Sequence, residues 1–365
     1  MNIAIAGGGT AGHVTPAIAV ALALTEDRVS FVGTSSGIEA RLVPDAGFPL
    51  TFIDVRGFDR ARPWSIAPVG WRAVGAIGDA RGLLKKLSPD VCLGMGGYVS
   101  LPVCLAARSL RVPIVVHEQN IVLGLANRIL KRTAARVAVT YEETLEGLGG
   151  RGALVGNPIR PEIASLDVAS ERELGWKRFE LDPTRKTVLV FGGSLGAQTV
   201  NEAALGLGIR WRDRSDVQIL HIVGPSSYES YEQRVREEVR GSRLIYRTES
   251  YVERMAEVYA AADFALCRGG ATTIAELGAV GLPALIVPYP HHRDRQQERQ
   301  ARILEGAGAA FVVADGGARP DVIAGKIEPL IDDEETLARM RAAMAVFGRP
   351  DAAQLLAAIV RACAR

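Results

Sequence analysis

Residues 2–24 read NIAIAGGGTAGHVTPAIAVALAL, and this stretch decides the fold. An apolar run of strand length is followed by a glycine-rich turn and then by a helical pattern. Residues 186–209, KTVLVFGGSLGAQTVNEAALGLGI, repeat the same order about half a chain later. A strand, a glycine turn and a helix open a βαβ unit, so each half predicts a doubly wound parallel sheet that binds ligands at the carboxyl ends of its strands.

Short apolar runs and helical patterns alternate through both halves, as is typical of parallel sheets. We predict strands over 2–6, 29–32, 51–55, 90–93, 113–116 and 136–139, and then over 186–191, 217–223, 242–246, 263–266, 284–287 and 310–313. Helices are expected over 17–24, 73–87, 101–109 and 123–131 and between the later strands, and three helical stretches close the chain. The turn-forming residues 149–152 and 156–158 are typical of a linker.

These patterns predict an α/β protein with two Rossmann-like domains that face each other across a cleft. The expected domains are 1–155 and 156–345, and residues 346–365 form a C-terminal helix that packs back on the first domain. A length of 365 residues suits two domains of ordinary size.

The composition is that of a globular protein, with 48% hydrophobic and 23% charged residues. A net charge of +2 argues against a general nucleic-acid binder. The halves differ, because residues 1–160 hold 17 basic and 12 acidic residues (+5) and the remainder holds 26 and 29 (−3). The four cysteines lack metal-binding spacing, which suits a reducing cytosol. Neither a signal-peptide pattern nor a bilayer-spanning apolar run is present, so we expect any membrane association to be peripheral.

The first glycine-rich loop, Gly7 to His13, formally contains G-x-G-x-x-G. A dinucleotide site would need an acidic residue about 20 positions later to hold the ribose, but the second strand ends in Val32-Gly33-Thr34. A turn that serves only strand-to-helix packing is the alternative. His13 stands at the start of the helix, where the helix dipole favours a neutral imidazole, so it is a candidate general base.

Two later helix starts also suit an anionic ligand. One follows Gly192 and Gly193. Arg160 could reach a phosphate in the expected cleft, although a solvated arginine is the plainer interpretation. The other lies in the segment 267–276. Glu276 falls in an apolar helical pattern and needs a partner, which is either a pair of ribose hydroxyls or an internal arginine or backbone group.

The basic surplus of the first half lies in residues 56–86, which hold seven basic and two acidic residues (+5). Its candidate membrane-binding residues are Arg60, Arg62, Trp64, Trp71 and Arg72. Aromatic and aliphatic side chains among cations suit an anionic membrane surface, and a core helix with a solvated basic face is the alternative.

A metal site is not indicated by the sequence. His291 and His292 form a pair without a third ligand at helical spacing, so a solvated loop is the simpler interpretation. No D-x-D motif occurs, so a carboxylate-bound divalent cation on a diphosphate is not expected.

Seven motifs in this order resemble the MurG-type bacterial N-acetylglucosaminyltransferases, which make lipid II. They are GGGTAGHVTPAIA (7–19), LGMGGYVSLP (93–102), VVHEQNIVLGLANR (115–128), VGNPIR (155–160), VFGGSLGAQTVNE (190–202), CRGGATTIAELGAVGLPALIVPYP (267–290) and DRQQ (294–297). The resemblance implies a GT-B fold, in which the C-terminal domain binds UDP-N-acetylglucosamine (UDP-GlcNAc) and the N-terminal domain binds lipid I.

The resemblance also implies the reaction and its surroundings. An inverting transfer would move GlcNAc from UDP-GlcNAc to the C4 hydroxyl of the MurNAc in lipid I, undecaprenyl-pyrophosphoryl-MurNAc-pentapeptide, forming a β1→4 bond. No cofactor is implied. The implied partners are these two substrates, an anionic membrane surface and other cell-wall synthesis proteins, but not nucleic acid, and the implied location is the cytoplasmic face of the plasma membrane.

Matching motif by motif implies a set of site residues. The donor would contact Thr10, Ala11, Gly12, Asn127, Arg160, Ser194, Val252, Ala271, Thr272, Thr273, Ile274, Ala275, Glu276 and Gln297, with Glu276 on the ribose and Val252 on the uracil. His13 would be the base and would face the acceptor together with Tyr98, Glu118 and Asn120, and Glu118 is the alternative base.

Three positions depart from the family pattern: Ala11 replaces a glycine, Gly269 stands where serine or alanine is frequent, and Gln300 replaces a frequent asparagine. Two other functions stay open from the residues. One is a UDP-sugar transferase with a different lipid acceptor, and the other is a non-catalytic membrane scaffold that binds a nucleotide sugar.

Overall fold

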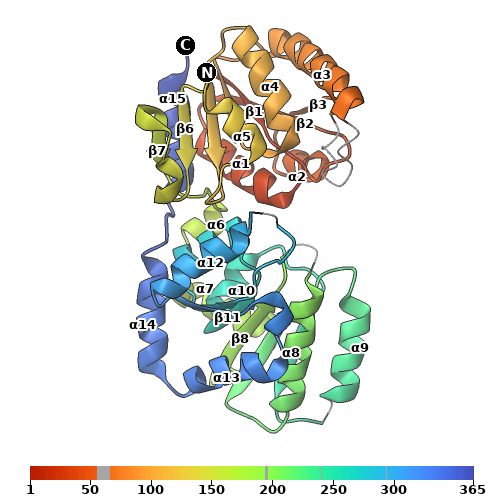
Figure 1. Ribbon diagram of the computed structural model, residues 1–365. Coiled ribbons are helices and arrows are strands. Elements are labelled where there is room, and N and C mark those ends of the chain that lie inside the picture. Colours follow the sequence, from red (N-terminus) through yellow and green to blue (C-terminus); the bar gives the residue numbers. More distant parts are fainter. Residues whose placement is uncertain (56–65, 194–195, 240, 293) are drawn as a thin grey trace. The chain divides into compact units, whose positions relative to one another are not determined.

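A computed structural model describes the chain apart from residues 56–65, 194–195, 240 and 293, and for residues 66–74 it describes the backbone. The described residues divide into two units (Figure 1). The first comprises Met1–Pro161 and Arg349–Arg365, and the second comprises Glu162–Gly348. Both divisions lie a few residues beyond the boundaries expected after residues 155 and 345.

The described part of the first unit holds a parallel seven-stranded sheet in the order β3-β2-β1-β4-β5-β6-β7. Its strands are β1 (Asn2–Ala6), β2 (Arg28–Gly33), β3 (Leu50–Phe52), β4 (Val91–Gly94), β5 (Ile114–Glu118), β6 (Arg136–Val139) and β7 (Gly152–Leu154). β1 pairs with β2 on one side and with β4 on the other. The strand order reverses at β1, so the loops after β1 and β4 leave the same edge at the point where such sheets bind ligands.

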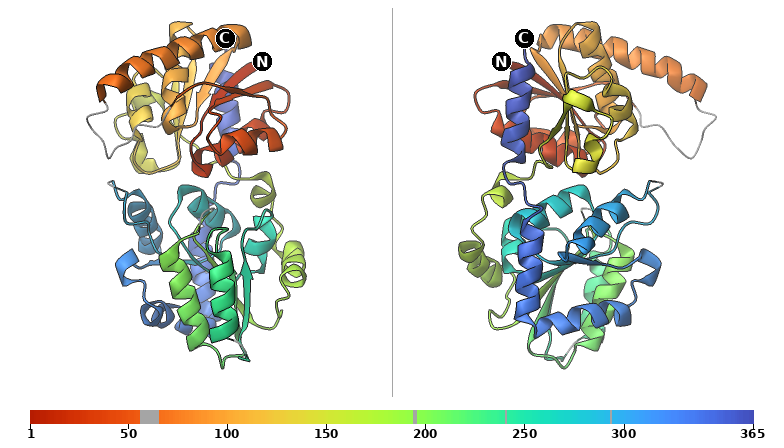
Figure 2. Two further views of the ribbon diagram at one scale, coloured as in Figure 1. Left: turned by 90° about the vertical axis from the view of Figure 1, so that its right-hand side faces the viewer. Right: turned by 60° about the vertical axis from the view of Figure 1, so that its left-hand side comes forward.

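Helices cover this sheet, and the last of them comes from the end of the chain. They are α1 (Ala11–Ala23), α2 (Glu39–Asp45), α3 (Ile66–Leu87), α4 (Gly97–Ser109), α5 (Leu125–Leu130) and α15 (Ala352–Cys363). α15, dark blue in Figure 2, packs against α1 and contacts β4, β5 and β6. The Arg361 Nε donates to Asp27 Oδ2 over 2.8 Å and fastens this helix to the turn after α1.

The described part of the second unit holds a parallel six-stranded sheet in the order β10-β9-β8-β11-β12-β13. Its strands are β8 (Lys186–Phe191), β9 (Val217–Ile222), β10 (Ile245–Glu249), β11 (Phe264–Cys267), β12 (Ala284–Ile286) and β13 (Ala310–Val312). Its helices are α7 (Val168–Arg178), α8 (Gln198–Arg210), α9 (Tyr228–Glu238), α10 (Met255–Ala261), α11 (Ala271–Val280), α12 (Gln296–Gly306), α13 (Pro320–Ile331) and α14 (Glu334–Ala345), and α6 (Pro161–Ala164) spans the division.

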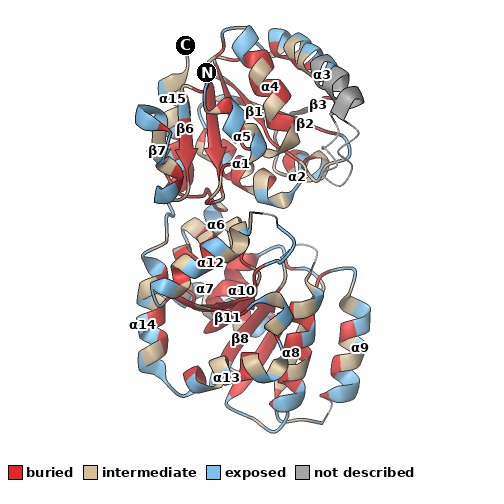
Figure 3. Ribbon diagram, viewed as in Figure 1, coloured by how far each residue is buried: buried red, intermediate tan, exposed pale blue. Residues whose placement is uncertain are grey.

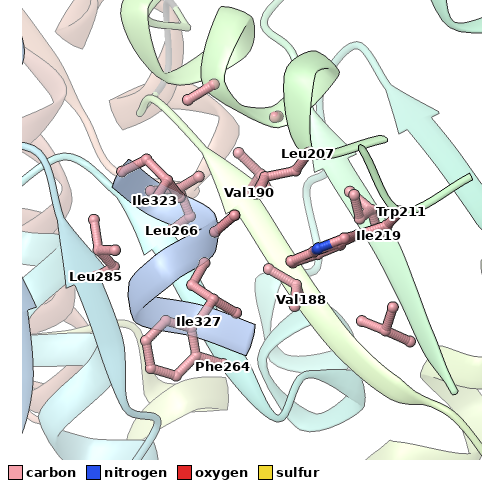
Figure 4. Packing of buried hydrophobic residues seen from close by; sticks show 14 of the residues in the cluster. Val188, Val190, Leu207, Trp211, Ile219, Phe264, Leu266, Leu285, Ile323 and Ile327 are labelled. Atoms are coloured by element: carbon pink, nitrogen blue, oxygen red, sulfur yellow. The ribbon is translucent and has the colours of Figure 1, made fainter. Parts of the chain in front are cut away.

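Both sheets are covered by helices, so inner strands such as β5 and β9 are buried along their whole length (Figure 3). In the second unit, Val188 and Val190 of β8 pack with Ile219 of β9 and with Ile323 and Ile327 of α13 (Figure 4). Burial of this apolar surface holds the sheet in place, and the loops at its carboxyl edge are therefore presented by a rigid support.

Several elements differ from the sequence-based expectation. Residues 149–152 were expected to belong to a linker, but Gly152 begins the edge strand β7, which is too short and too rich in small residues to show an apolar pattern. The strand expected over 242–246 lies at Ile245–Glu249. α2 was not expected, and α1 begins at Ala11 instead of residue 17 because its first turn holds small and polar residues.

Candidate functional sites

The first candidate site lies at the carboxyl edge of the first sheet, where the loops after β1 and β4 touch. A Cβ atom on Gly97 would lie 2.6 Å from the Gly8 carbonyl oxygen, and one on Gly9 would lie 2.7 Å from the Tyr98 ring. Gly9 and Gly97 also have φ values of +88° and +76°, which side-chain-bearing residues rarely adopt. Both loops therefore require glycine to approach this closely.

His13 is half-buried in the first turn of α1 and lies against the second of these loops. Its Nδ1 is 3.2 Å from Gln119 Oε1, and a Cβ atom on Gly96 would come within 3.1 Å of the same nitrogen. Burial lowers the pKa of His13 below its usual value, although the charge of Glu118 and hydrogen bonds to Gln119 and Met95 act in the opposite direction. The imidazole is therefore neutral at pH 7, as a general base requires.

Glu118, at the end of β5, was the alternative base. Its Oε1 accepts from the backbone N and the Nδ2 of Asn120, both at 3.1 Å. Its Oε2 accepts from the backbone N of Gly124 at 2.8 Å and from Asn127 Nδ2 at 2.9 Å. Four donors occupy the acceptor positions of this carboxylate, so the geometry favours a structural role for Glu118 and leaves His13 as the better candidate for the base.

Asn127 brings one unpaired polar atom to the same edge. Its Nδ2 also donates to the His117 carbonyl at 2.9 Å, whereas its buried Oδ1 has no hydrogen-bond partner among the described residues. A buried acceptor without a partner costs stability unless a ligand or a water molecule satisfies it. Asn127 is therefore placed to accept a hydrogen bond from a ligand.

A buried carboxylate beneath the first loop was not anticipated from the sequence. Glu39, at the start of α2, accepts from the Gly9 backbone N at 3.0 Å and from the backbone N and Oγ1 of Thr34 at 3.0 and 2.8 Å. Tyr98 joins this network through its hydroxyl, 3.3 Å from Thr34 Oγ1. In the sequence, Glu39 is marked only by the small residues 33–37 that precede it. In the structure, a Cβ atom on Gly33 or Gly37 would clash with the Glu39 side chain.

Three of the remaining expected residues of the first unit, Thr10, Ala11 and Gly12, lie where the first loop meets α1. Thr10 occupies the N-cap position of α1, but its side chain makes no capping hydrogen bond within the described residues. Ala11 is the first residue of that helix, a position where alanine causes no strain, so its departure from the family glycine is tolerated locally. Gly12 is exposed, and Arg160 is partly exposed after β7.

The second candidate site lies at the start of α11 in the second unit. Gly270 is the N-cap, and the buried hydroxyl oxygen of Thr272 has no hydrogen-bond partner among the described residues. Glu276 is buried in the second turn of α11 and accepts a 2.8 Å hydrogen bond from the Tyr259 hydroxyl. An internal partner of Glu276 is thus a tyrosine of α10, whereas an internal arginine or backbone group was expected as the alternative to a ribose, and the local sequence gives no signal for this tyrosine.

The other residues of the second unit that the resemblance singles out lie outside α11. Gln297 Oε1 accepts from the Tyr289 backbone N at 2.9 Å, and a Cβ atom on Gly269 would lie 3.0 Å from the Gln297 carbonyl oxygen, which explains why glycine suits position 269. Val252 is buried before α10, and Gln300 is fully buried in α12. Ser194 lies outside the described residues.

The predicted membrane segment is largely outside the described part of the chain. This applies to Arg60, Arg62 and Trp64, and for Trp71 and Arg72 only the backbone of α3 is described. Among the helices that the structure describes, none is long and apolar enough to cross a membrane. The described residues also contain no group of three histidine, cysteine, aspartate or glutamate side chains able to hold a metal ion.

Known proteins resemble this chain along its whole length. Residues 3–139 match the glycosyltransferase family 28 N-terminal domain, and residues 187–356 match the C-terminal domain of the same family. A relative in Nocardioides sp., named UDP-N-acetylglucosamine--N-acetylmuramyl-(pentapeptide) pyrophosphoryl-undecaprenol N-acetylglucosamine transferase, is 40% identical over 364 residues, which are 99% of this chain and 97% of the relative.

Two further matches agree with this one. A relative of the same name in Desulforamulus reducens is 36% identical and covers 96% of each chain. The crystal structure of Acinetobacter baumannii MurG shares 28% sequence identity, superposes with a TM-score of 0.79 and covers 99% of each chain.

Proposed function

Because this chain belongs to glycosyltransferase family 28 and has the two Rossmann-like domains of the GT-B fold, we propose that it transfers GlcNAc from UDP-GlcNAc to the C4 hydroxyl of MurNAc in lipid I, giving lipid II. The observation that carries the proposal is the near-full-length identity of 36–40% to relatives whose names state this transfer. The neutral, half-buried His13 at a ligand-binding sheet edge supports it.

Each unit would have a distinct task in the transfer. The second unit would hold UDP-GlcNAc through the N-termini of α8 and α11, with Glu276 on the ribose, Val252 at the uracil and Gln297 and Ser194 nearby. Helix N-termini attract phosphate because their backbone N–H groups are unpaired and the dipole is positive there. The first unit would bind lipid I through His13, Tyr98, Glu118 and Asn120.

The first unit would also supply further donor contacts through Thr10, Ala11, Gly12, Asn127 and Arg160. Of these, Asn127 has a buried acceptor oxygen without a partner among the described residues, and a donor hydroxyl or amide would satisfy it. Arg160 would add a positive charge for the diphosphate.

The reaction would be a single displacement with inversion. His13 Nε2 would take the proton from the C4 hydroxyl as the C4 oxygen forms a bond to C1 of GlcNAc. The bond between C1 and the phosphate oxygen breaks, and its electron pair leaves with UDP. The helix N-termini and Arg160 would stabilise the charge that develops on the leaving diphosphate.

We also propose that the enzyme works as a peripheral protein on the cytoplasmic face of the plasma membrane, where lipid I presents its headgroup. The basic and aromatic residues Arg60, Arg62, Trp64, Trp71 and Arg72 support this location through their sequence pattern. Other cell-wall synthesis proteins would meet it there.

A donor screen tests the function. UDP release and the mass of the lipid product are measured with a short-chain lipid I analogue and with UDP-GlcNAc, UDP-GalNAc or UDP-Glc. We expect release with UDP-GlcNAc and a product heavier by one GlcNAc residue. Release with UDP-GalNAc or UDP-Glc but not with UDP-GlcNAc would assign a transferase with a different donor. Binding of UDP-GlcNAc without release would overturn the proposed transfer to lipid I and would favour a different lipid acceptor or a scaffold.

Replacement of the base tests the mechanism. His13→Ala should lower kcat at least ~100-fold, because no other group takes the proton, and should leave the affinity for UDP-GlcNAc unchanged. The measurement is steady-state UDP release, with donor affinity from calorimetry. A rate near that of the unmodified enzyme would show that another group is the base.

A further inference from the structure

We propose that Gln119 is a positioning residue that fixes the tautomer of His13, with hydrogen on Nδ1 and the lone pair on Nε2. The inference deepens the proposed function, because it rests on His13 as the base. A neutral imidazole has two tautomers, and only the one with an unprotonated nitrogen facing the acceptor hydroxyl can take its proton. Something in the protein must therefore select between them.

The selection begins at a backbone carbonyl. The Met95 carbonyl, directly after β4, can only accept hydrogen bonds, and Gln119 Nε2 donates to it over 2.8 Å. The carboxamide is thereby oriented, because the reverse orientation would bring two oxygens together. Gln119 Oε1 then faces His13 Nδ1 at 3.2 Å, and an oxygen acceptor requires that this nitrogen carry the hydrogen.

Packing holds this chain of hydrogen bonds in place. Gln119 is 1% exposed, so water has little access to either end of its carboxamide. The imidazole lies against two glycines. A Cβ atom on Gly96 would lie 3.0 Å from His13 Cε1, and one on Gly97 would lie 3.4 Å from His13 Cδ2. Met95 itself is tied to β1, because its backbone N donates to the Ala6 carbonyl at 2.8 Å.

The groups around the ring explain why an amide occupies this position. Glu118 is the anion that acts on His13, and the buried His117 also interacts with it electrostatically. Glu118 is held by four hydrogen-bond donors. A second carboxylate at position 119 would favour the imidazolium, whereas a neutral amide sets the tautomer and leaves the ring uncharged.

The tautomer can be read directly by NMR on the full-length enzyme. Histidines labelled with ¹⁵N report which ring nitrogen is protonated, and the chain has only five of them. The His13 signals are assigned by their absence from His13→Ala. We expect the Nδ1–H tautomer in the unmodified enzyme and a larger share of the Nε2–H tautomer in Gln119→Met. This variant keeps the side-chain volume and removes both hydrogen bonds of Gln119, but it leaves the Met95 carbonyl near the ring.

A matched control separates an effect on the His13 tautomer from a general loss of folding stability. Gln218 is another fully buried glutamine, in β9, and it also donates to a backbone carbonyl, that of Asp182 at 2.8 Å. Gln218→Met makes the same chemical change away from His13. It should lower the unfolding temperature comparably and leave the His13 tautomer as it is.

The kinetic expectation follows from the same geometry. Gln119→Met should lower kcat about tenfold without raising the KM for UDP-GlcNAc, since a hydrogen bond of ordinary net strength is lost at the base. Gln119→Glu should provide an acceptor for Nδ1–H and recover part of kcat at alkaline pH, although its other oxygen has no hydrogen to donate to the Met95 carbonyl. Its negative charge should raise the pKa of His13, so the acidic limb of its pH profile should move to higher pH.

The outcomes distinguish this inference from the proposed function. A full rate in His13→Ala would remove the base role, yet the spectra would still report on Gln119. An Nε2–H tautomer in the unmodified enzyme, or an unchanged Nδ1–H tautomer in Gln119→Met, would overturn the inference even if the transferase activity is found as proposed.

Discussion

At the scale of single residues, the first unit uses a buried carboxylate to hold its glycine loop. Burial raises the pKa of Glu39, but hydrogen bonds from Gly9 and Thr34 outweigh it and hold the pKa below its usual value. A carboxyl group with a lower pKa in the folded state stabilises the fold at pH values above its unfolded pKa. That contribution is lost as the pH falls through the folded pKa.

Glu39→Gln should therefore destabilise the protein most at neutral pH. We expect the free energy of unfolding to fall by about 1–3 kcal/mol at pH 7, because an amide N–H group now faces backbone donors. The difference from the unmodified protein should shrink below pH 4.5, the ordinary pKa of the group. Denaturant unfolding at several pH values measures this, and the exposed Glu26→Gln is the control. A pH-independent difference would contradict the account.

At the scale of elements, the alternation of apolar runs with helical patterns predicted both parallel sheets, because buried parallel strands are apolar throughout. The short edge strand β7 and helix α2 lack such a pattern and were missed. His13 was predicted as a candidate general base because its place at a helix start can be recognised from the local sequence. The contacts of Gln119 with His13 and of Tyr259 with Glu276 join distant segments, so no local pattern could indicate them.

Helix α15, at the end of the chain, contributes to the stability of the first unit by packing against the core around β1. Leu356 is fully buried with Ile3 and Ile5 of β1, whereas its neighbour Leu355 is 40% exposed. Leu356→Ala should cost about 2–5 kcal/mol of stability, because it leaves a cavity beside the central strand. Leu355→Ala should change stability by at most about 0.5 kcal/mol. Thermal unfolding compares the two, and equal losses would mean that α15 does not complete this core.

At the scale of the whole molecule, charge is divided between the two halves of the chain, and the basic surplus of residues 56–86 equals that of the first half. If this segment meets an anionic membrane, the enzyme should bind liposomes that contain acidic lipid, and salt should weaken the binding because it screens the attraction. Reversing the charge at Arg60, Arg62 and Arg72 to glutamate should abolish most of it.

The control for this experiment lies in the second unit. Arg236, Arg319 and Arg339 are exposed, and each is paired with a nearby carboxylate in an ion pair of the kind that contributes little to stability. Their reversal to glutamate changes the net charge by the same amount. Co-sedimentation should then show strong binding for this control and weak binding for the first triple variant. Equal loss in both would mean that net charge alone drives binding, and binding that salt does not weaken would remove the electrostatic contribution of residues 56–86.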